Sequence, residues 1–245
     1  MNNIRTVSDT KRAFYNIHTR PINSIYRRVV EELMVEMHLL AVNVDFQYDP
    51  IYALGVVTAF DRFMQGYKPE ADVGSIYTAL IGSQESDPQQ YRADAREVEA
   101  IAAAESVNNL QERAKAARDN AGGDRLQQTF HAVATHPKFK YSRLFAIGLY
   151  TLVEKSEPEQ VADKEGLETV LGHLSEGLNL PKDKLIKDLD LYRSNLEKVA
   201  QARIAMDELT QAERKKREQR QKEAAGSAPG DESPNESAEE AVSDS

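Results

Sequence analysis

The sequence contains no cysteine. This absence excludes disulfide bonds, thiolate metal ligands and a cysteine nucleophile. The sequence also has no apolar run near the ~20 residues that a membrane-spanning helix needs, since its longest uncharged stretches, PIYALGVVTAF and VGSIYTALIGSQ, have about a dozen residues each. No apolar segment of the secretory-signal type follows the first methionine. We therefore expect a soluble protein that attaches to a membrane peripherally at most.

Short catalytic motifs are absent too. The sequence has no GxxxxGK(S/T) or GxGxxG phosphate loop, no GxSxG turn and no HExxH pair. The pair Gly122-Gly123 lacks the lysine and the preceding strand of a phosphate loop, so we interpret it as a helix break. His38 shares a helix with glutamates, but Val35 occupies the position where a Glu-x-x-His metal motif needs its carboxylate. We therefore predict structural or surface histidines, no metal, no cofactor and no enzymatic activity.

Helix signals dominate the sequence, and strand alternation is nearly absent. Asp49-Pro50 and Asp87-Pro88 combine a capping side chain with a proline, which is tolerated in the first helical turn. Pro21 is expected to open a helix in the same way. We predict an all-α fold, a single multi-helix bundle of roughly eight helices whose last helix extends past the core, with the bundle domain spanning residues 1–180. The expected helices span 21–44, 50–65, 70–81, 88–106 or 88–120, 124–135, 140–155 and 164–177, followed by a long helix from 181.

The helix expected at 21–44 is the most informative one. Its main apolar stripe has the helical period of a buried face. In its second half Val35, Leu39 and Val42 make the opposite face apolar as well. We therefore expect this helix to enter the core, with its basic N-terminal end at the surface. A short helix before it is expected to pack three side chains against the core: Phe14, Tyr15 and Ile17.

The long C-terminal helix, 181–225, carries a partly coiled-coil-like heptad seam over 185–210, after which its sequence is charged. Arg203 within the seam is costly in a dry dimer interface, so we expect the helix to fold back on its own bundle and the protein to be a monomer. Pairing with a second chain is the alternative. Residues 226–245 carry six acids and no base, a composition typical of disorder. The seam residues are Leu185, Leu189, Tyr192, Leu196, Val199, Arg203, Met206 and Thr210.

Charge is distributed unevenly along the chain. The net charge is −9, yet the first 28 residues carry six basic side chains and one acid, and a second basic run spans 214–222. Basic clusters bind acidic partner surfaces, anionic headgroups or nucleic acid. The overall acidity and the lack of a recognisable nucleic-acid-binding motif argue against nucleic acid. We predict six partner-binding residues: Arg20, Arg27, Arg28, Arg214, Lys215 and Arg217.

Two sequence blocks, TVSDTKRAFYNIHTRPINSIYRRVVEELMVEMHLLAVN and FQYDPIYALGVVTAFDRFMQGY, resemble the thylakoid formation family. The similarity continues more loosely through HPKFKYSRLFAIGLYTLVE and the C-terminal helix, over about 220 residues. Members of that family are soluble helical proteins of cyanobacteria and plastids. The resemblance implies a non-enzymatic accessory role in thylakoid membrane biogenesis and photosystem II repair, with FtsH-type membrane proteases and photosystem II complexes as partners. It supplies no catalytic residues and no partner-binding positions.

Plant members of that family carry a transit peptide, which we do not find in this sequence. The resemblance therefore implies a cyanobacterial member at the cytoplasmic face of the thylakoid membrane, soluble or peripherally attached. Two alternatives stay open. The protein binds the anionic membrane surface, or it binds photosystem II assembly intermediates without contacting a protease.

Overall fold

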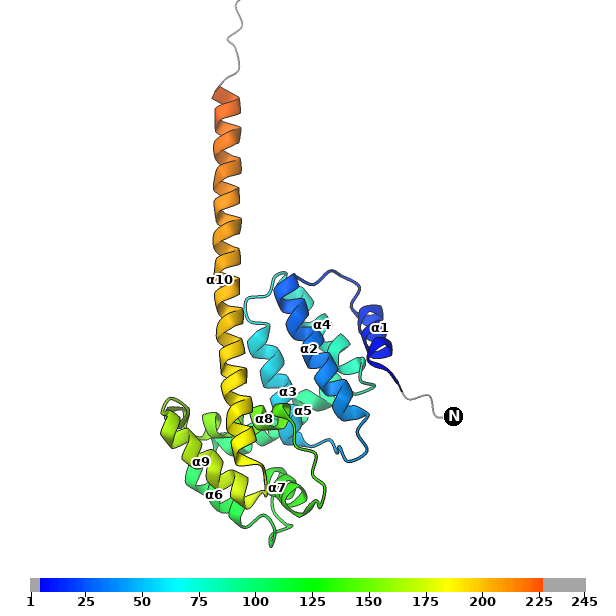
Figure 1. Cartoon of the computed structure of the whole chain (residues 1–245), viewed down its shortest axis with the longest axis vertical. Coiled ribbons are helices and arrows are strands. Elements are labelled where there is room, and N and C mark those ends of the chain that lie inside the picture. The colour runs from blue at the N-terminus through cyan, green and yellow to red at the C-terminus, as the bar shows by residue number, and fades with distance from the viewer. Residues whose placement is uncertain (1–4, 227–245) are drawn as a thin grey trace, which may run out of the picture. The chain divides into compact units, whose positions relative to one another are not determined.

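The computed structural model describes residues 5–226, with side chains through residue 221. Within that range the chain forms ten α-helices, two short 3₁₀ helices and no strand, which confirms the all-α prediction (Figure 1). Residues up to Ala202 form one compact unit, and residues from Arg203 belong to a second. The helices are α1 Val7–Ile17, α2 Ser24–Ala41, α3 Pro50–Phe63, α4 Val73–Gly82, α5 Pro88–Ala103, α6 Val107–Lys115, α7 Arg125–Thr135, α8 Arg143–Ser156, α9 Lys164–Gly177 and α10 Lys182–Gly226, with 3₁₀ helices at Glu70–Asp72 and Pro158–Val161.

The predicted helix starts at capping aspartates are confirmed. Asp49 accepts hydrogen bonds of 2.9 and 2.8 Å from two N–H groups in the first turn of α3. Asp87 accepts one of 2.8 Å at the start of α5. Pro50 and Pro88 follow directly as the first helical residues. The carboxylates satisfy N–H groups that have no partner inside the helix, so these two boundaries are encoded locally.

The predicted start of α2 at Pro21 is wrong. The helix begins at Ser24, and the Asn23 side chain caps it by accepting a hydrogen bond of 3.1 Å from the backbone N–H of Ile25. Pro21 lies outside the helix and is exposed. A proline permits a helix to start, whereas a side-chain acceptor stabilises the start, and asparagine supplies that acceptor here.

The expectation that α2 enters the core on all sides is also wrong. One face of the helix is buried, with Met34 and Met37 at 2% and 1% exposure. On the other side Leu39 and Val42 stay 58% and 42% exposed, and Val44 beyond the helix end is 96% exposed. The described residues thus cover one face of α2 and leave an apolar stripe on the other.

The predicted first helix is present as α1, but it buries fewer residues than expected. Phe14 is fully buried and Tyr15 is partly buried against the core. Ile17, in the last turn of the helix, is 46% exposed, so that part of the prediction is wrong. α1 packs mainly on α4, and Ile17 lies at the end of this contact, beside Gly82.

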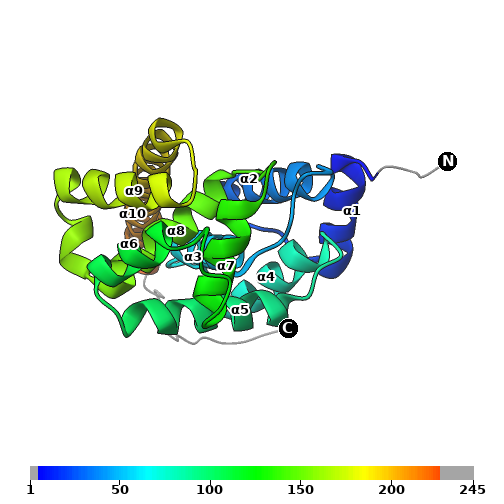
Figure 2. The ribbon, with the colours of Figure 1, turned by 90° about the horizontal axis from the view of Figure 1, so that it is seen from below.

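The segment expected as one helix from residue 88 contains two. α5 ends at Ala103, and α6 begins after Ser106, whose hydroxyl accepts a hydrogen bond of 3.3 Å from the backbone N–H of Asn109. The new cap redirects the chain, so that α6 packs beside α9 (Figures 1 and 2). The division of this segment and the short helix α1 explain why the described residues form ten α-helices and not the roughly eight that we expected from the sequence.

The centre of the first unit is the crossing of α3 and α8, the two helices in most extensive contact. Their backbones approach so closely at two glycines that a side chain has no room. A Cβ atom on Gly55 would lie 1.7 Å from the carbonyl oxygen of Leu144, and one on Gly148 would lie 2.0 Å from that of Ile51. Most residues of α3 and α8 are buried as a result.

The first part of α10 packs on the same core. Leu185, Leu189 and Tyr192 are buried, and Leu196 and Val199 are half-buried against it. The first five seam positions therefore fold back on their own chain. The oligomeric state and the predicted boundaries at 180 and 225 remain predictions.

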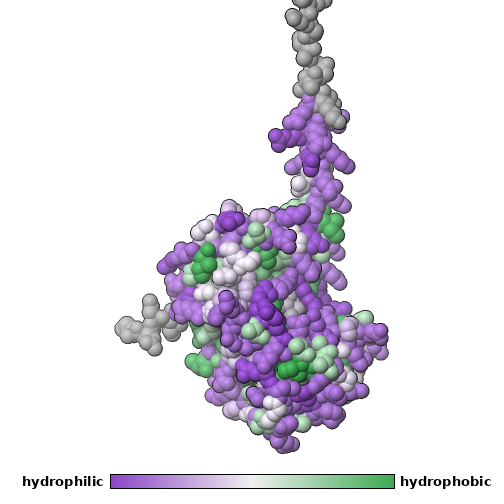
Figure 3. Space-filling view, turned by 180° about the vertical axis from the view of Figure 1, so that it is seen from behind, coloured by the Kyte–Doolittle hydropathy of each residue, from purple (hydrophilic) through white to green (hydrophobic). Residues whose placement is uncertain are grey.

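The second unit, in its described part, consists of residues 203–226 of α10. This segment is rich in charged and polar residues, and two large apolar side chains in it, Ile204 and Leu209, are exposed. On the face of the first unit seen from behind, hydrophilic side chains dominate and apolar patches are separate (Figure 3). None of the described helices is both long enough and apolar enough to span a membrane. The acidic segment predicted at 226–245 lies outside the described residues, apart from Gly226.

We expect Gly148→Ala to destabilise the protein by about 3 kcal/mol or more, because the added methyl group meets the backbone of α3 and cannot be accommodated by rotating a side chain. Gly74→Ala is the matched control, since a Cβ there meets nothing within 4 Å. That change is expected to stabilise by about 0.5–1 kcal/mol. Urea unfolding of both variants measures the difference. Equal stability of the two variants would contradict the crossing described above.

Stability is expected to depend on pH through Asp49. Loss of hydration raises the pKa of this carboxyl to about 7, although its two N–H donors act in the opposite direction. The folded state therefore binds the proton more tightly than the unfolded chain, whose aspartates titrate near ~3.9. The free energy of unfolding falls as the pH rises from about 4 to about 7 and then levels off.

Asp49→Asn keeps a capping acceptor and removes this titration. We expect the variant to gain stability over the wild type as the pH rises from 5 to 8, measured by urea unfolding at both values. A difference between the two proteins that is the same at pH 5 and pH 8 would show that Asp49 does not titrate in this range.

Candidate partner-binding groove

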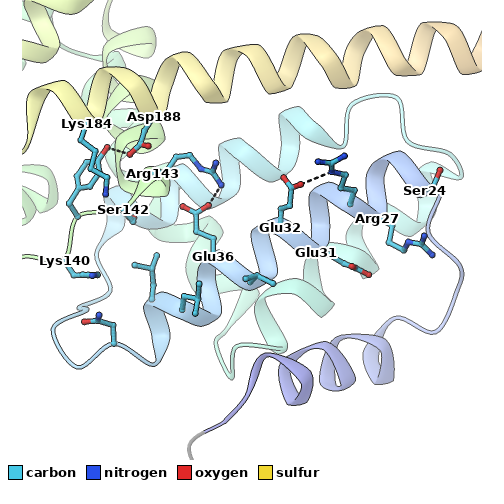
Figure 4. A pocket seen from close by; sticks show the side chains of 16 residues that line it. Ser24, Arg27, Glu31, Glu32, Glu36, Lys140, Ser142, Arg143, Lys184 and Asp188 are labelled. Carbon is cyan, nitrogen blue, oxygen red and sulfur yellow. Dashed lines mark hydrogen bonds and ion pairs between the residues drawn. The ribbon is translucent and has the colours of Figure 1, made fainter.

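The first unit has a wide surface groove, which we call the α2 groove (Figure 4). Its walls come from α2, from residues 140–143 at the start of α8, and from the first turns of α10. Its volume is about 1030 Å³. Apolar side chains of α2 and many charged groups line it. The charged residues are Arg27, Arg28, Glu31, Glu32, Glu36, Lys140, Arg143, Lys184 and Asp188.

An ion pair between Arg143 and Glu36 joins α8 to α2 across the groove (Figure 4). Both side chains are largely removed from solvent. Burial raises the pKa of the Glu36 carboxyl, and the Arg143 guanidinium opposes this shift. Removing one member leaves the other as a poorly solvated charge, so the pair holds this part of the groove in place.

A second contact joins the α7–α8 connection to α10. The Tyr141 hydroxyl donates a hydrogen bond of 2.9 Å to Asp188. Burial and this acidic acceptor together raise the pKa of Tyr141 well above its usual range, so it stays a neutral donor. The Lys184 ammonium lies 4.9 Å from the centre of the same ring, in a cation–π contact. Lys184 and Asp188 are therefore occupied by Tyr141.

Glu31 and Glu32 are also paired. Glu31 accepts a hydrogen bond of 2.9 Å from the Tyr15 hydroxyl and lies 3.0 Å from the Lys11 ammonium. Burial acts to raise the pKa of Glu31, but these two donors outweigh it and lower the pKa overall. Glu32 lies 3.0 Å from Arg28, one helical turn away. Every carboxylate of the groove thus has a cationic or hydroxyl partner.

Two cations of the groove are not held in an ion pair by the part of the chain that the structure describes. Neither Arg27 nor Lys140 forms an ion pair with any residue that the structure describes, and both are exposed. The α2 groove therefore has surplus positive charge. An apolar stripe on α2 and its C-terminal end consists of Val35, Leu39 and Val42. Val35 and Leu39 line the α2 groove, and Val42 lies next to it in the sequence. Exposed apolar side chains rimmed by charge are typical of binding surfaces.

The structure brings two of the six predicted partner-binding residues, Arg27 and Arg28, into the α2 groove. Arg20 lies elsewhere, where its guanidinium is 2.5 Å from the Asp72 carboxylate. Asp72 is only 3% exposed, so Arg20 has a structural role in neutralising it. The other three residues, Arg214, Lys215 and Arg217, lie in the second unit; all three are exposed, and Arg214 pairs with Glu218 at 2.9 Å.

Sequence reasoning missed Lys140, Arg143 and Lys184. They lie 97 or more residues along the chain from the α2 side of the groove, which ends at Asn43. No local pattern distinguishes them from other surface cations. Only the fold brings them to α2.

Two histidines have structural contacts. His38 is buried and its Nδ1 lies 2.9 Å from the Thr10 hydroxyl. His18 pairs with Ser75 at 3.0 Å, and burial lowers the pKa of this imidazole. Among residues 5–226 no group of three or more His, Asp or Glu side chains is arranged to hold a metal ion.

The fold and the groove describe an all-α protein whose candidate site is a binding surface. The sequence model of the family described as "Thylakoid formation protein" matches residues 6–221, and the chain belongs to this family. It is 57% identical to "Protein Thf1" of Nostoc punctiforme over 91% of this chain and 95% of that one. It is 58% identical to "Protein Thf1" of Trichormus variabilis over 90% and 95%.

The solved "Structure of Psb29 at 1.55A" has the same fold, with a TM-score of 0.74. Its sequence is 45% identical, and the match covers 87% of this chain and 98% of that one. The resemblance seen in the sequence is thereby confirmed at the level of the family. The family name connects the chain to thylakoid formation.

Arg20 and Arg27 differ in their expected effect on folding. Arg20→Glu places a second carboxylate against buried Asp72, and we expect a loss of about 1–3 kcal/mol, below the cost of breaking a fully buried pair because Arg20 is itself largely exposed. Arg27→Glu is expected to change stability by less than about 0.5 kcal/mol. Denaturant unfolding of both variants checks this. If Arg27→Glu were the more damaging, the assignment of Arg20 as structural would be wrong.

Proposed function

We propose that this protein is a non-catalytic accessory factor in thylakoid membrane biogenesis and photosystem II repair, and that it docks an FtsH-type membrane protease through the α2 groove. The observation that carries the docking proposal is the presence of two exposed cations, Arg27 and Lys140, that form no ion pair with a described residue and lie beside exposed Leu39. The protease surface that fits is acidic with an apolar anchor. Membership of the thylakoid formation family supports the cellular setting.

The groove suits macromolecular docking for two physical reasons. Unpaired surface cations steer an acidic partner and fix its orientation, while an apolar contact at the centre slows dissociation. The pairs Arg143–Glu36 and Tyr141–Asp188 hold the groove before the partner arrives. Little conformational entropy is then lost on binding.

We place the protein at the cytoplasmic face of the thylakoid membrane. The relatives named above come from cyanobacteria, where thylakoid-bound proteases and photosystem II share this membrane. Photosystem II complexes are then the second partner, reached through the protease or directly.

The alternative function is binding to the anionic membrane surface, and the second unit favours it. Arg214, Lys215 and Arg217 are exposed on the part of α10 that follows the seam, and the described residues there form no continuous apolar face. Such a segment adsorbs to anionic headgroups electrostatically, with about 1 kcal/mol per basic residue. Binding of this kind is lost at moderate salt, because exposed charges are screened within ~10 Å at 0.1 M.

The test of groove docking is an affinity pull-down from detergent-solubilised thylakoids. The groove variant is Arg27→Glu/Lys140→Glu, and the matched control is Arg118→Glu/Lys187→Glu, which changes the charge equally at exposed positions that do not line the groove. We expect the protease to be captured by the wild type and the control and to be reduced at least tenfold with the groove variant, which corresponds to ~1.4 kcal/mol or more.

Three results would count against parts of this proposal. Equal capture by the groove variant and the control would show that the groove is not the docking site. Failure of the wild type to capture the protease would contradict direct binding between the two proteins. Flotation of the wild type with anionic liposomes at low salt, without protease capture, would favour the membrane-surface alternative, and Arg214→Glu/Lys215→Glu/Arg217→Glu should then abolish flotation.

A further inference from the structure

A second, narrower cavity lies on the other side of Arg28 and Arg143, between α2, α3, α8 and the part of α10 before Arg203. We call it the interhelical cleft. Its volume is about 370 Å³, within the ~300–1,000 Å³ of small-molecule sites. Clefts between the helices of a bundle are a common place for such sites. All of its lining residues belong to the first unit.

The inner surface of the cleft is apolar. Ala59 of α3 and Leu144 and Ile147 of α8 are at most 1% exposed. The Phe63 and Tyr192 rings meet edge to face on another wall, with their centres 5.7 Å apart. An unfilled space of this kind leaves its lining atoms without dispersion contacts on one side. A hydrocarbon chain would restore those contacts.

The space stays open because small side chains line it and because the backbone of α10 does not closely approach the neighbouring helices. Ala59 and Ala202 face it from α3 and α10. In the first unit α10 has no extensive close backbone contact with another described helix, unlike the tightly crossed α3 and α8. It is held by longer side chains such as Leu189 and Tyr192. The opening is thus a product of how α10 packs.

The mouth of the cleft is cationic. Arg28, Arg143 and Lys198 line it together with a single carboxylate, Glu32. Glu32 is paired with Arg28, and Arg143 is paired with Glu36. Lys198 is exposed and forms no ion pair with any residue in the described part of the chain. The mouth therefore has a free charge that complements one anionic group.

We propose that the interhelical cleft binds a single acyl chain that carries an anionic headgroup, with the chain between α3, α8 and α10 and the headgroup at Lys198. The ligand is a free fatty-acid anion or the chain of an anionic bilayer lipid, which share this chemistry. The proposal is independent of protease docking, since the cleft has its own apolar floor and its own exposed cation, Lys198.

The experiment titrates the full-length protein with dodecanoate below its critical micelle concentration, followed by calorimetry. Dodecyltrimethylammonium has the same chain with the opposite charge, and butyrate has the headgroup without the chain. We expect saturable binding of dodecanoate with a negative heat-capacity change, which marks apolar burial. We expect binding of the other two to be at least tenfold weaker. Absence of dodecanoate binding would overturn the proposal.

Variants locate the binding site. Val199→Trp fills the cleft from α10 and should abolish binding, and Ala202→Phe serves the same purpose if the first variant fails to fold. Lys198→Glu should weaken dodecanoate about threefold to tenfold, whereas Lys187→Glu on the same helix, outside the cleft, should leave it unchanged. Equal affinity of the cleft-filling variant and the wild type, or equal weakening by both lysine reversals, would refute the assignment.

Vesicles distinguish the two sources of the chain. The wild type and the cleft-filling variant are floated with phosphatidylcholine vesicles that contain phosphatidylglycerol. If the variant loses both dodecanoate and vesicle binding, a bilayer lipid supplies the chain. If it loses dodecanoate alone, the ligand is a free fatty-acid anion.

Discussion

The close crossing of α3 and α8 is the contact on which the rest of the first unit depends. Because Gly55 and Gly148 carry no side chain, the two backbones meet directly and most residues of both helices are buried. This crossing also fixes where the first turn of α8 lies in space, because the backbone of Leu144 contacts Gly55. Arg143, the first residue of α8, then reaches Glu36 on α2. A backbone contact in the core thereby determines the position of a charged side chain at the surface.

The sequence predicted those helix boundaries that depend on neighbouring residues. Asp49 and Asp87 cap helices through N–H groups two or three residues away, so their role is readable locally. Pro21 misled the prediction because Asn23, two residues later, supplies the capping acceptor. The apolar side chains at Leu39 and Val42 suggested burial, but periodicity shows only that a face is apolar. Whether another element covers that face depends on the whole fold.

The candidate site was predictable only on its α2 side. Arg27 and Arg28 could be identified from the charge of the N-terminal block, although Arg20 in the same block neutralises buried Asp72 instead. Asp72 lies 52 residues from Arg20, and Arg143 lies 107 residues from Glu36. A single sequence does not indicate which charged residues that are far apart along the chain come into contact in the fold. Charge counting therefore selects a region, and the fold selects the residues within it.

Three side chains, Arg28, Glu32 and Arg143, line both the α2 groove and the interhelical cleft. The two concave surfaces therefore adjoin and share these side chains. A ligand in either one that moves the shared side chains changes the free energy of binding in the other. Thermodynamic linkage requires that influence to be equal in both directions. Movement of these three shared side chains is therefore the means by which a ligand in one concave surface would affect binding in the other.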